Sequence, residues 1–394
     1  MIRLIKYTFY HENETKKKLA DFVVKSKRLS FGSECESFER NFAKYQGRKD
    51  AVMFNSGSSA NLALIRALLN LGILRKGDAV GFSATTWSTN VMPLIEMGLE
   101  PVPVDVEIET LNVSSETLKK AFKRRRLKGF FLTNALGFCD DIDNIKTFCK
   151  RNKIVFIEDN CEALGSVFKR KKLGNFGLAG TFSFYVGHHM PTIEGGAVAT
   201  DDKELAAMLR IVRAHGWDRN LKEAESKKLR RCFKITSPLY AKYTFYDLGY
   251  NLRPTEIQGF LGKNQLKFLP EIVKKRQNNF ISIGRQIYRM KNKYVPIEYG
   301  HMDVVSNFTF PVVCRSGRIM EELVKKCDKK IEIRPLIAGD ITRQPFFKKY
   351  VKRYADSKMT PNAKIIHERG IYFANHPDLS AAEKKTIIDV FSKG

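Results

Sequence analysis

From about residue 48 onward, short apolar runs alternate with segments whose apolar residues recur at helical spacing. Between Asn61 and Leu71 the apolar positions fall at helical intervals and Gly72 follows as a stop signal, so this stretch predicts a helix. Further helices are expected over 90–97, 114–126 and 143–152. Short apolar runs predict strands at 78–83, 101–105, 129–133, 154–159 and 181–185. This alternation predicts an α/β fold, with a mainly parallel sheet covered by helices on both faces.

The pattern changes at about Pro254, where a long helical stretch begins that reaches about Met290. Beyond it we expect strands near 308–313 and 331–334 and a last helix over 380–392. The 394 residues are therefore expected to form a large domain over 1–253 and a smaller α+β domain over 254–394. Because ligands of such sheets bind beyond the carboxyl ends of the strands, the site is expected there.

The composition is that of a globular protein, with 43% hydrophobic and 28% charged residues. The first residues lack the apolar core of a signal peptide, and no run approaches the roughly 18 apolar residues of a membrane-spanning helix. We therefore expect a cytoplasmic protein with no membrane partner. The seven cysteines are scattered and form no C-x-x-C pair, which argues against a disulfide framework or a zinc site.

The formal net charge is +27, with basic clusters at 123–126, 169–172 and 227–231. Lysine and arginine could bind the phosphates of a nucleic acid. These clusters are separated along the chain, however, and none is interleaved with aromatic residues. We expect a solvated surface that attracts an anionic small substrate, and no nucleic-acid partner.

Two segments could bind a phosphorylated cofactor. The segment 55–61 (NSGSSAN) lies between a short strand and a helix, where Gly57 allows a close turn and the helix N-terminus attracts anions. An ordinary capped helix start would look the same. Asp159 ends a predicted strand, where its carboxylate could pair with a protonated pyridine nitrogen, although a loop aspartate is the simpler interpretation.

A third segment, 183–196 (SFYVGHHMPTIEGG), leads from a strand through two adjacent histidines to a Gly-Gly pair. Adjacent histidines do not easily place both rings on one metal, and no third ligand is near, so we expect no metal site. On their own, the two histidines could equally be polar surface residues.

Together, the order and spacing of these segments resemble the DegT/DnrJ/EryC1/StrS family of PLP-dependent sugar aminotransferases. Further matching segments are 31–39 (FGSECESFE), 213–219 (RAHGWDR), 248–256 (LGYNLRPTE), 334–335 (RP) and 344–345 (QP). The resemblance covers more than nine-tenths of the chain. It implies a type I aminotransferase fold, pyridoxal 5′-phosphate as cofactor and a homodimer.

The resemblance also implies roles for individual residues. Gly57, Ser58 and Ser183 are expected to hold the cofactor phosphate, and Asn251 to reach the phosphate of the neighbouring subunit. Trp87 is expected to stack on the pyridine ring and Asp159 to pair with its nitrogen.

One departure from the family pattern is informative. Family members usually carry a lysine before the Gly-Gly segment, and that lysine binds PLP covalently, whereas His188 stands here and no lysine occurs from 173 to 202. An imidazole cannot replace the lysine as the covalent link, but it can act as a general base near neutral pH. His188, with Glu162 where transaminases commonly have glutamine, resembles the GDP-4-keto-6-deoxy-D-mannose 3-dehydratase branch of the family.

The resemblance to this branch implies a reaction. A 4-keto-6-deoxy nucleotide-diphosphate sugar would lose its C3 hydroxyl, with PMP as the reacting form of the cofactor, His188 as the base and glutamate as the amino donor. Glu162 is expected in the cofactor pocket, where it could also position the leaving hydroxyl. His215, Arg253 and Arg334 are expected to bind the substrate, since arginine suits bidentate contacts with anions.

Four alternatives remain open at this point. Another lysine could reach the cofactor, which would make the protein a 4-aminotransferase. A related CDP-sugar dehydrase uses the same histidine with a [2Fe–2S] cluster, but such a cluster needs four thiolates together and these cysteines are far apart in sequence. The chain could be a non-catalytic binding protein on the same scaffold, or an inactive relative in which position 188 has drifted.

Overall fold

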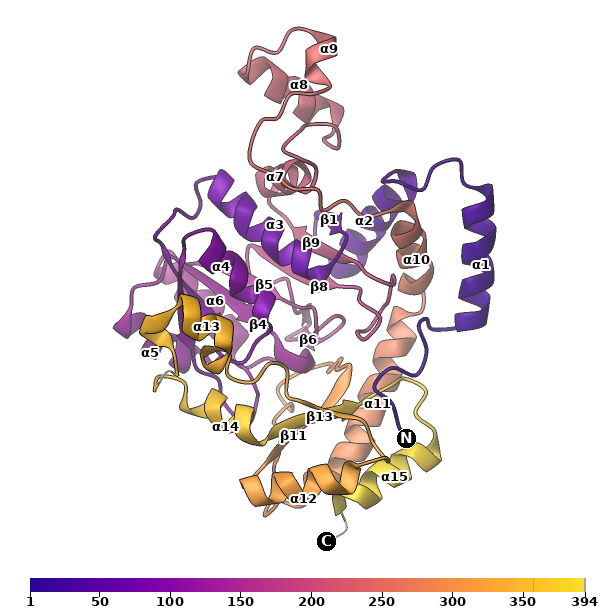
Figure 1. Ribbon diagram of the computed structural model, residues 1–394, viewed down its shortest axis with the longest axis vertical. Coiled ribbons are helices and arrows are strands. Elements are labelled where there is room, and N and C mark those ends of the chain that lie inside the picture. The colour runs from indigo at the N-terminus through magenta and orange to yellow at the C-terminus, as the bar shows by residue number, and fades with distance from the viewer. Residues whose placement is uncertain (357, 393–394) are drawn as a thin grey trace.

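The computed structural model describes residues 1–356 and 358–392 and is built around a seven-stranded sheet (Figure 1). The strand order is β1-β9-β8-β5-β4-β2-β3. The strands are β1 (Asp50–Phe54), β2 (Ala79–Ser83), β3 (Glu100–Val104), β4 (Gly129–Thr133), β5 (Val155–Asp159), β8 (Ala179–Ser183) and β9 (Gly196–Thr200). Strands β3, β2, β4, β5 and β8 are paired in parallel, while β9 is antiparallel to both its neighbours. The expected mainly parallel α/β sheet is therefore confirmed.

Helices cover both faces of this sheet. They are α2 (Ser33–Gln46), α3 (Gly57–Asn70), α4 (Met92–Glu96), α5 (Ser115–Arg124), α6 (Ile142–Arg151) and α7 (Lys203–Arg213). Along β1 the side chains alternate between two cores: Val52 and Phe54 belong to the large hydrophobic core with α3, and Ala51 and Met53 to a second core with α2. This period of two follows from the pleat of a strand, and burial on both faces explains why the strands read as apolar runs.

A second, four-stranded antiparallel sheet lies in the C-terminal part of the chain, in the order β10-β11-β13-β12. Its strands are β10 (Tyr294–Val295), β11 (Thr309–Cys314), β12 (Ile333–Pro335) and β13 (Gly370–Ala374). The helices around it are α11 (Leu269–Ile287), α12 (Gly317–Cys327), α13 (Pro345–Tyr350), α14 (Pro361–Arg369) and α15 (Ala381–Ser392). The two sheets fall on either side of position 253, and the domain boundary there remains a proposal.

Two sequence-based expectations about elements need correction. The long helix expected over 254–290 is in fact two helices, α10 (Glu256–Leu266) and α11. The break between them lies just before Pro270, because proline lacks the N–H that an unbroken helix needs. The strand expected over 181–185 is β8, two residues earlier, because its pairing with β9 ends at Ser183. The residues that follow form the loop that carries the two histidines.

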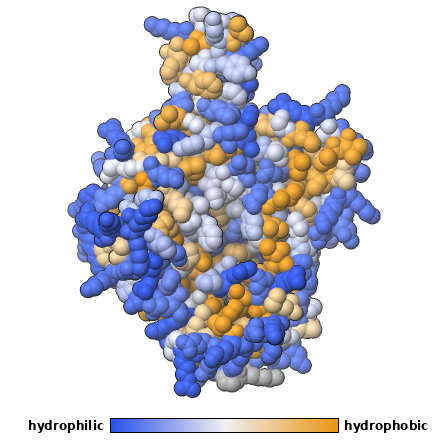
Figure 2. All heavy atoms as spheres, in the orientation of Figure 1, coloured by the Kyte–Doolittle hydropathy of each residue, from blue (hydrophilic) through white to orange (hydrophobic). Residues whose placement is uncertain are grey.

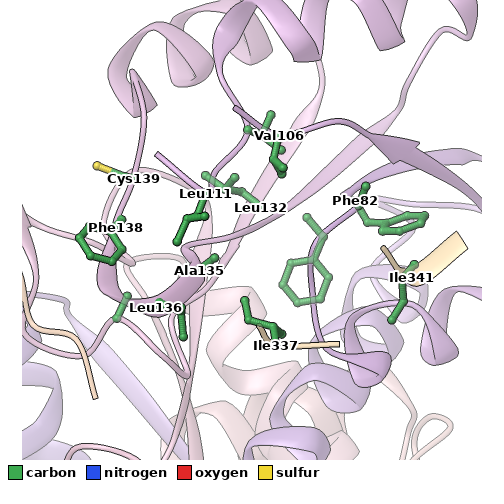
Figure 3. Packing of buried hydrophobic residues seen from close by; sticks show 14 of the residues in the cluster. Phe82, Val106, Leu111, Leu132, Ala135, Leu136, Phe138, Cys139, Ile337 and Ile341 are labelled. Carbon is green, nitrogen blue, oxygen red and sulfur yellow. The ribbon is translucent and has the colours of Figure 1, made fainter. Parts of the chain in front are cut away.

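The C-terminal part packs closely on the carboxyl end of the large sheet. In Figure 3, Ile341, from the segment after β12, lies beside Phe82 of β2, and Ile337 of the same segment lies between that pair and Leu136 of the loop after β4. The N-terminal segment also crosses over, because Ile2 forms a parallel bridge with Ile331 and donates its N–H to the carbonyl of Lys330 at 2.7 Å. The N-terminal residues are thereby held beside β12, at the mouth of the cavity described below.

One segment stands away from the body of the molecule. Residues 219–248, here called the projecting segment, carry α8 (Glu223–Cys232) and α9 (Pro238–Ala241) and extend beyond the sheet at the top of Figure 1. Its surface includes hydrophobic atoms, as Figure 2 shows. The exposed large hydrophobic side chains are Phe233, Leu239, Tyr240, Tyr243, Phe245 and Leu248. No helix within 1–356 or 358–392 is long and apolar enough to cross a membrane.

Candidate active site

A cavity of about 490 Å³ lies at the carboxyl ends of β5 and β8, between the large sheet and the C-terminal part of the chain. Eight of the residues predicted from the sequence line it: Gly57, Ser58, Trp87, Asp159, Glu162, Ser183, His188 and Arg334. The location is the one expected for a mainly parallel sheet. Residues that lie far apart in the sequence therefore meet around one space.

The end of the cavity at the start of α3 suits a phosphate. Ser56 caps this helix, because its hydroxyl accepts a hydrogen bond from the N–H of Ser59 at 3.0 Å. Gly57 is the first residue of the helix, and a Cβ placed there would lie 2.7 Å from the Cβ of Ser183. Only glycine fits this contact without a shift. The first N–H groups of a helix have no intrahelical partner and favour an anion.

Asp159 ends β5 and is only 4% exposed. Its Oδ2 accepts hydrogen bonds from the Nδ2 atoms of Asn61 at 3.0 Å and Asn90 at 2.7 Å, and its Oδ1 accepts from the N–H of Cys161 at 2.8 Å. These donors stabilise the ionised carboxylate in a buried place. The side-chain oxygens of both asparagines are buried without a partner among the described residues. Asp159 is thus a fixed negative charge in the cavity wall.

Trp87 precedes a short 3-10 turn (Ser88–Asn90) and lines the cavity. Its side chain is 56% exposed, which is unusual for so large an apolar residue. An exposed indole at a cavity wall offers a flat apolar face to a planar ligand.

His188 lies in the loop between β8 and β9, where its N–H donates to the carbonyl of Tyr185 at 3.0 Å. Its ring packs edge-on against Phe308, with 4.9 Å between the ring centroids. The Nδ1 atom is buried and has no hydrogen-bond partner in the described part of the chain. Burial, and to a smaller extent the charge of Arg276, lowers the pKa of His188 to about 4. At neutral pH the ring is uncharged and able to accept a proton.

The neighbouring His189 has a different place. Its side chain is 2% exposed, and its Nε2 lies 2.8 Å from the carbonyl oxygen of Ser306. Burial lowers its pKa well below the ordinary value. It does not line the cavity beside Asp159, so the two adjacent histidines point to different surroundings and only His188 faces the site.

Glu162 follows β5 and lines the same cavity. One carboxylate oxygen accepts the N–H of Leu136 at 2.9 Å. Burial, opposed by that hydrogen bond and supported by the charge of Asp159, raises the pKa of Glu162 to about 8. The cavity therefore holds a neutral imidazole and a protonated carboxylic acid at neutral pH, which is the combination of a base and an acid.

The cavity contains residues that the sequence did not indicate. Glu332 accepts the N–H of Leu4 at 3.1 Å and the Nη2 of Arg334 at 2.7 Å. Further lining residues that were not predicted are Leu4, Ile5, Asn61, Asn90, Thr133, Cys161, Tyr185, Phe308 and Tyr372. A carboxylate two residues from Arg334 on the same strand edge was a signal that could have been used. The others depend on how the C-terminal part packs against the sheet.

Three predicted residues do not line the cavity of their own chain: His215, Asn251 and Arg253. They lie together at the base of the projecting segment. Asn251 pairs with Ala214 in a β-bridge, and its side-chain oxygen accepts the Nε of Arg253 at 3.0 Å. The ring of His215 packs on Trp217, with 4.8 Å between centroids. Their roles stay predictions, and Asn251 was expected to act on a neighbouring subunit.

The model of the DegT/DnrJ/EryC1/StrS aminotransferase family matches residues 10–392. The chain belongs to this family. The expected family is therefore confirmed. His188 then stands at the position where the sequence pattern of this family leads us to expect a lysine.

Two curated proteins are similar to this chain along most of its length. A GDP-4-keto-6-deoxy-D-mannose 3-dehydratase of Escherichia coli O55:H7 is 35% identical, over 90% of this chain and 90% of that protein. A dTDP-4-dehydro-2,6-dideoxy-D-glucose 3-dehydratase of Saccharopolyspora spinosa is 31% identical, over 90% of this chain and 78% of that one.

The solved structures agree on the fold. A crystal structure of GDP-4-keto-6-deoxymannose-3-dehydratase with a trapped PLP-glutamate geminal diamine has a TM-score of 0.88 and 32% identity, with both chains covered completely. The Escherichia coli enzyme with bound hydrated PLP has a TM-score of 0.89 and 32% identity, over 100% of this chain and 99% of that one. The aminotransferase fold expected from the sequence is confirmed.

Proposed function

We propose that the protein is a PLP-dependent nucleotide-sugar 3-dehydratase, which removes the C3 hydroxyl of a 4-keto-6-deoxyhexose. The observation that carries the proposal is the cavity itself: His188 lines it, and no lysine does in the part of the chain that the structure describes. A transaminase of this family needs a lysine at the cofactor. A cavity with an imidazole instead suits non-covalent cofactor binding and proton transfer.

The cavity fits PLP. Gly57, Ser58 and Ser183 would hold the phosphate, at a helix start that a larger residue than glycine would obstruct. Asp159 would pair with the pyridine nitrogen, because the asparagine donors hold its carboxylate in place at the cavity wall. Trp87 would cover one face of the ring. When bound as PLP or PMP, the cofactor supplies an electron sink conjugated to the substrate.

The chain's own groups would move the protons. His188, uncharged at neutral pH, would take a proton at its free imidazole nitrogen. Glu162, whose raised pKa of about 8 keeps it protonated, would donate to the departing C3 hydroxyl and release it as water. Because no lysine lines the cavity in the described part of the chain, the amine nitrogen of the cofactor would not remain on the sugar.

The finer assignment is a GDP-linked 4-keto-6-deoxymannose with glutamate as the amino donor that restores PMP. It is supported by the two GDP-sugar dehydratases among the similar proteins, at 35% and 33% identity, and by a solved variant of such an enzyme with bound GDP-perosamine. Arg334, whose guanidinium is held by Glu332 at the cavity wall, would contact the sugar or the diphosphate.

We further propose that the working unit is a homodimer. The projecting segment exposes aromatic residues that a second copy would cover, with Tyr240 73% and Tyr243 68% exposed. His215, Asn251 and Arg253 at its base would then serve the partner's cavity, with Asn251 at the phosphate. This arrangement would explain why these three do not line the cavity of their own chain.

Product analysis tests the proposed function. The purified protein is incubated with PLP, glutamate and a panel of 4-keto-6-deoxy nucleotide sugars, and products are identified by mass spectrometry. The proposal expects a sugar that has lost the C3 oxygen, together with 2-oxoglutarate and ammonia. A product that has gained an amine in place of the keto group would identify a 4-aminotransferase instead.

Borohydride reduction gives a second, independent test. The wild-type protein with PLP should acquire no covalent label, whereas His188→Lys should acquire PLP at position 188. If reduction labels another lysine of the wild-type chain, the proposed role of His188 is wrong.

A further inference from the structure

A buried arginine lies directly behind the His188 loop. Arg276 belongs to α11 and is 5% exposed. Among residues 1–356 and 358–392 no carboxylate forms an ion pair with its guanidinium within 4.0 Å, and the charge of Asp378, which pairs with Lys275, reaches it only from farther away. Burying a cation without a counter-charge is unfavourable unless its N–H groups are satisfied in another way.

Two of the three guanidinium nitrogens donate to backbone carbonyls from three segments, while the buried Nε has no partner in the described part of the chain. Nη1 donates to the carbonyls of Phe308 at 2.7 Å and Asn375 at 2.8 Å, and Nη2 donates to the carbonyl of His188 at 3.2 Å. His188 belongs to the loop after β8, whereas the other two carbonyls belong to the C-terminal part of the chain. A planar guanidinium with several fixed donors is suited to join three such groups at once.

These contacts determine the place of the imidazole in two ways. The bond to the carbonyl of His188 fixes the peptide unit from which the ring projects. The bond to Phe308 fixes the backbone of the residue whose ring packs against that imidazole, 4.9 Å away between centroids. One side chain thus anchors both the histidine and the surface on which its ring rests.

We propose that Arg276 is a positioning residue for His188, which holds the imidazole at the cavity wall. The proposal rests on the proposed function for the use of that imidazole, but not for the contacts. A lysine at this position would keep the positive charge but could not join the three carbonyls. A methionine would lose both the charge and the hydrogen bonds.

The electrostatic part follows from the groups that face His188. Burial, and to a smaller extent the positive charge of Arg276, lowers the pKa of His188, and both act likewise on His189 and His376. The titratable groups that share the two cavities beside the ring come from several elements and include Arg276 of α11, Tyr185, His189 and Glu194 of the loop, Tyr7 of the N-terminal segment, Asp159 and Glu162 at the end of β5, and Glu332, Arg334, Tyr372 and His376 of the C-terminal part. Of these, Arg276 is the one whose charge acts on the pKa of His188.

A titration without substrate tests the electrostatic part. Histidines are labelled with ¹³C at Cε1 in the full-length protein, and the resonance of His188 is identified by its loss in His188→Asn. Removing a positive charge favours the protonated ring, so Arg276→Met should raise the pKa of His188 by about one unit or more. Arg276→Lys should leave it near the wild-type value, and Arg285→Lys, a matched control on an exposed position of α11, should change nothing.

Kinetics test the positioning part. Arg276→Lys should lower kcat about a hundredfold, the cost of a reacting group displaced by roughly an ångström, while KM for the nucleotide sugar and the absorbance spectrum of bound PLP stay as in the wild type. This variant keeps the charge and is the one to use if Arg276→Met does not fold. A wild-type kcat in Arg276→Lys, or an unchanged His188 titration in Arg276→Met, would overturn the inference.

The two levels of proposal fail separately. If His188→Asn still removes the C3 oxygen at the wild-type rate, the proposed function fails whatever Arg276 does. If His188→Asn is inactive but the Arg276 variants behave as the wild type, only the role of Arg276 is wrong.

Discussion

The cavity and the projecting segment differ in how their side chains are satisfied. In the cavity, Asp159 is buried and holds three hydrogen-bond donors from its own chain. On the projecting segment, Leu239, Tyr240 and Tyr243 are exposed, between 68% and 73% of each side chain. The first region holds its carboxylate by hydrogen bonds within one chain, whereas the second exposes apolar surface to water.

This difference suggests that the cavity and the projecting segment contribute to the proposed function in two ways, one through chemistry and the other through assembly. In the proposed function the cavity would carry the chemistry, because it places His188, Glu162 and Asp159 around one space. The projecting segment, with His215 and Asn251 at its base, would carry assembly and the completion of a neighbour's site. Variants of the cavity should therefore change rates at constant assembly, whereas variants of the projecting segment should change both.

The largest effect is expected for the base. His188→Asn should lower the rate of C3 deoxygenation roughly a hundred- to ten-thousandfold, the usual contribution of a general base. Binding of PLP, followed by absorbance, should persist, since Asp159 and the start of α3 are untouched. Size-exclusion chromatography should show the same assembly as the wild type. Loss of the assembly in this variant would contradict the expectation that cavity variants change rates alone.

The next effect concerns the acid. Glu162→Gln should lower kcat about a hundredfold, because the amide cannot donate the proton that the leaving hydroxyl needs. Since the raised pKa of about 8 keeps Glu162 protonated at neutral pH, the wild-type rate should fall as pH rises through about 8. The pH–rate profile of the glutamine variant should lack this alkaline limb, and its survival would assign the limb to another group.

On the projecting segment, Tyr240→Ser should weaken self-association about thirtyfold, the equivalent of a central aromatic at an interface. Analytical ultracentrifugation measures the change. Tyr350→Ser, on α13 and 61% exposed, removes a comparable exposed aromatic and serves as the control. Equal behaviour of the two variants would mean that the projecting segment is not the assembly surface.

The smallest effect is a dependence of stability on pH. His189 and His376 are buried with lowered pKa values, to about 3 for His376, so the unfolded chain binds protons below pH 6.5 that the folded chain does not. The contribution of these two histidines to stability is therefore fully present above pH 6.5 and is lost as pH decreases, by up to about 1.4 kcal/mol per histidine and pH unit, while Glu162, with its raised pKa, acts in the opposite direction. Urea denaturation at pH 7.0 and 5.5 measures this, and His376→Asn should flatten the slope.

The sequence predicts those parts of the fold in which burial on both faces produces apolar runs. The strands at 78–83, 101–105 and 129–133 correspond to β2, β3 and β4 within one residue at each end. The last expected strand was displaced by two residues, because the apolar residues Phe184 and Tyr185 continue the pattern after the pairing with β9 has ended. Hydropathy cannot show where a ladder of hydrogen bonds stops.

The candidate site is predictable to the extent that its residues end strands or start helices. Gly57, Asp159 and Ser183 meet at the cavity for that reason, and His188 follows from the family pattern. Tyr372 was missed because it comes from the antiparallel sheet, whose placement against the large sheet has no local signal, whereas Glu332 could have been found from its position two residues before Arg334. Arg276 was missed because a helical arginine with carbonyl partners looks in sequence like a solvated one.

The exposed thiol on α8 has a practical consequence. Cys232 is exposed, whereas Cys161 in the cavity wall has a pKa raised well above the ordinary value by burial and by Asp159. A maleimide fluorophore at neutral pH should therefore react first at position 232, because the thiolate is the reactive form. The emission of a dye attached there would report the association of two chains. Because Cys232 does not line the cavity, the label would not change the cavity residues.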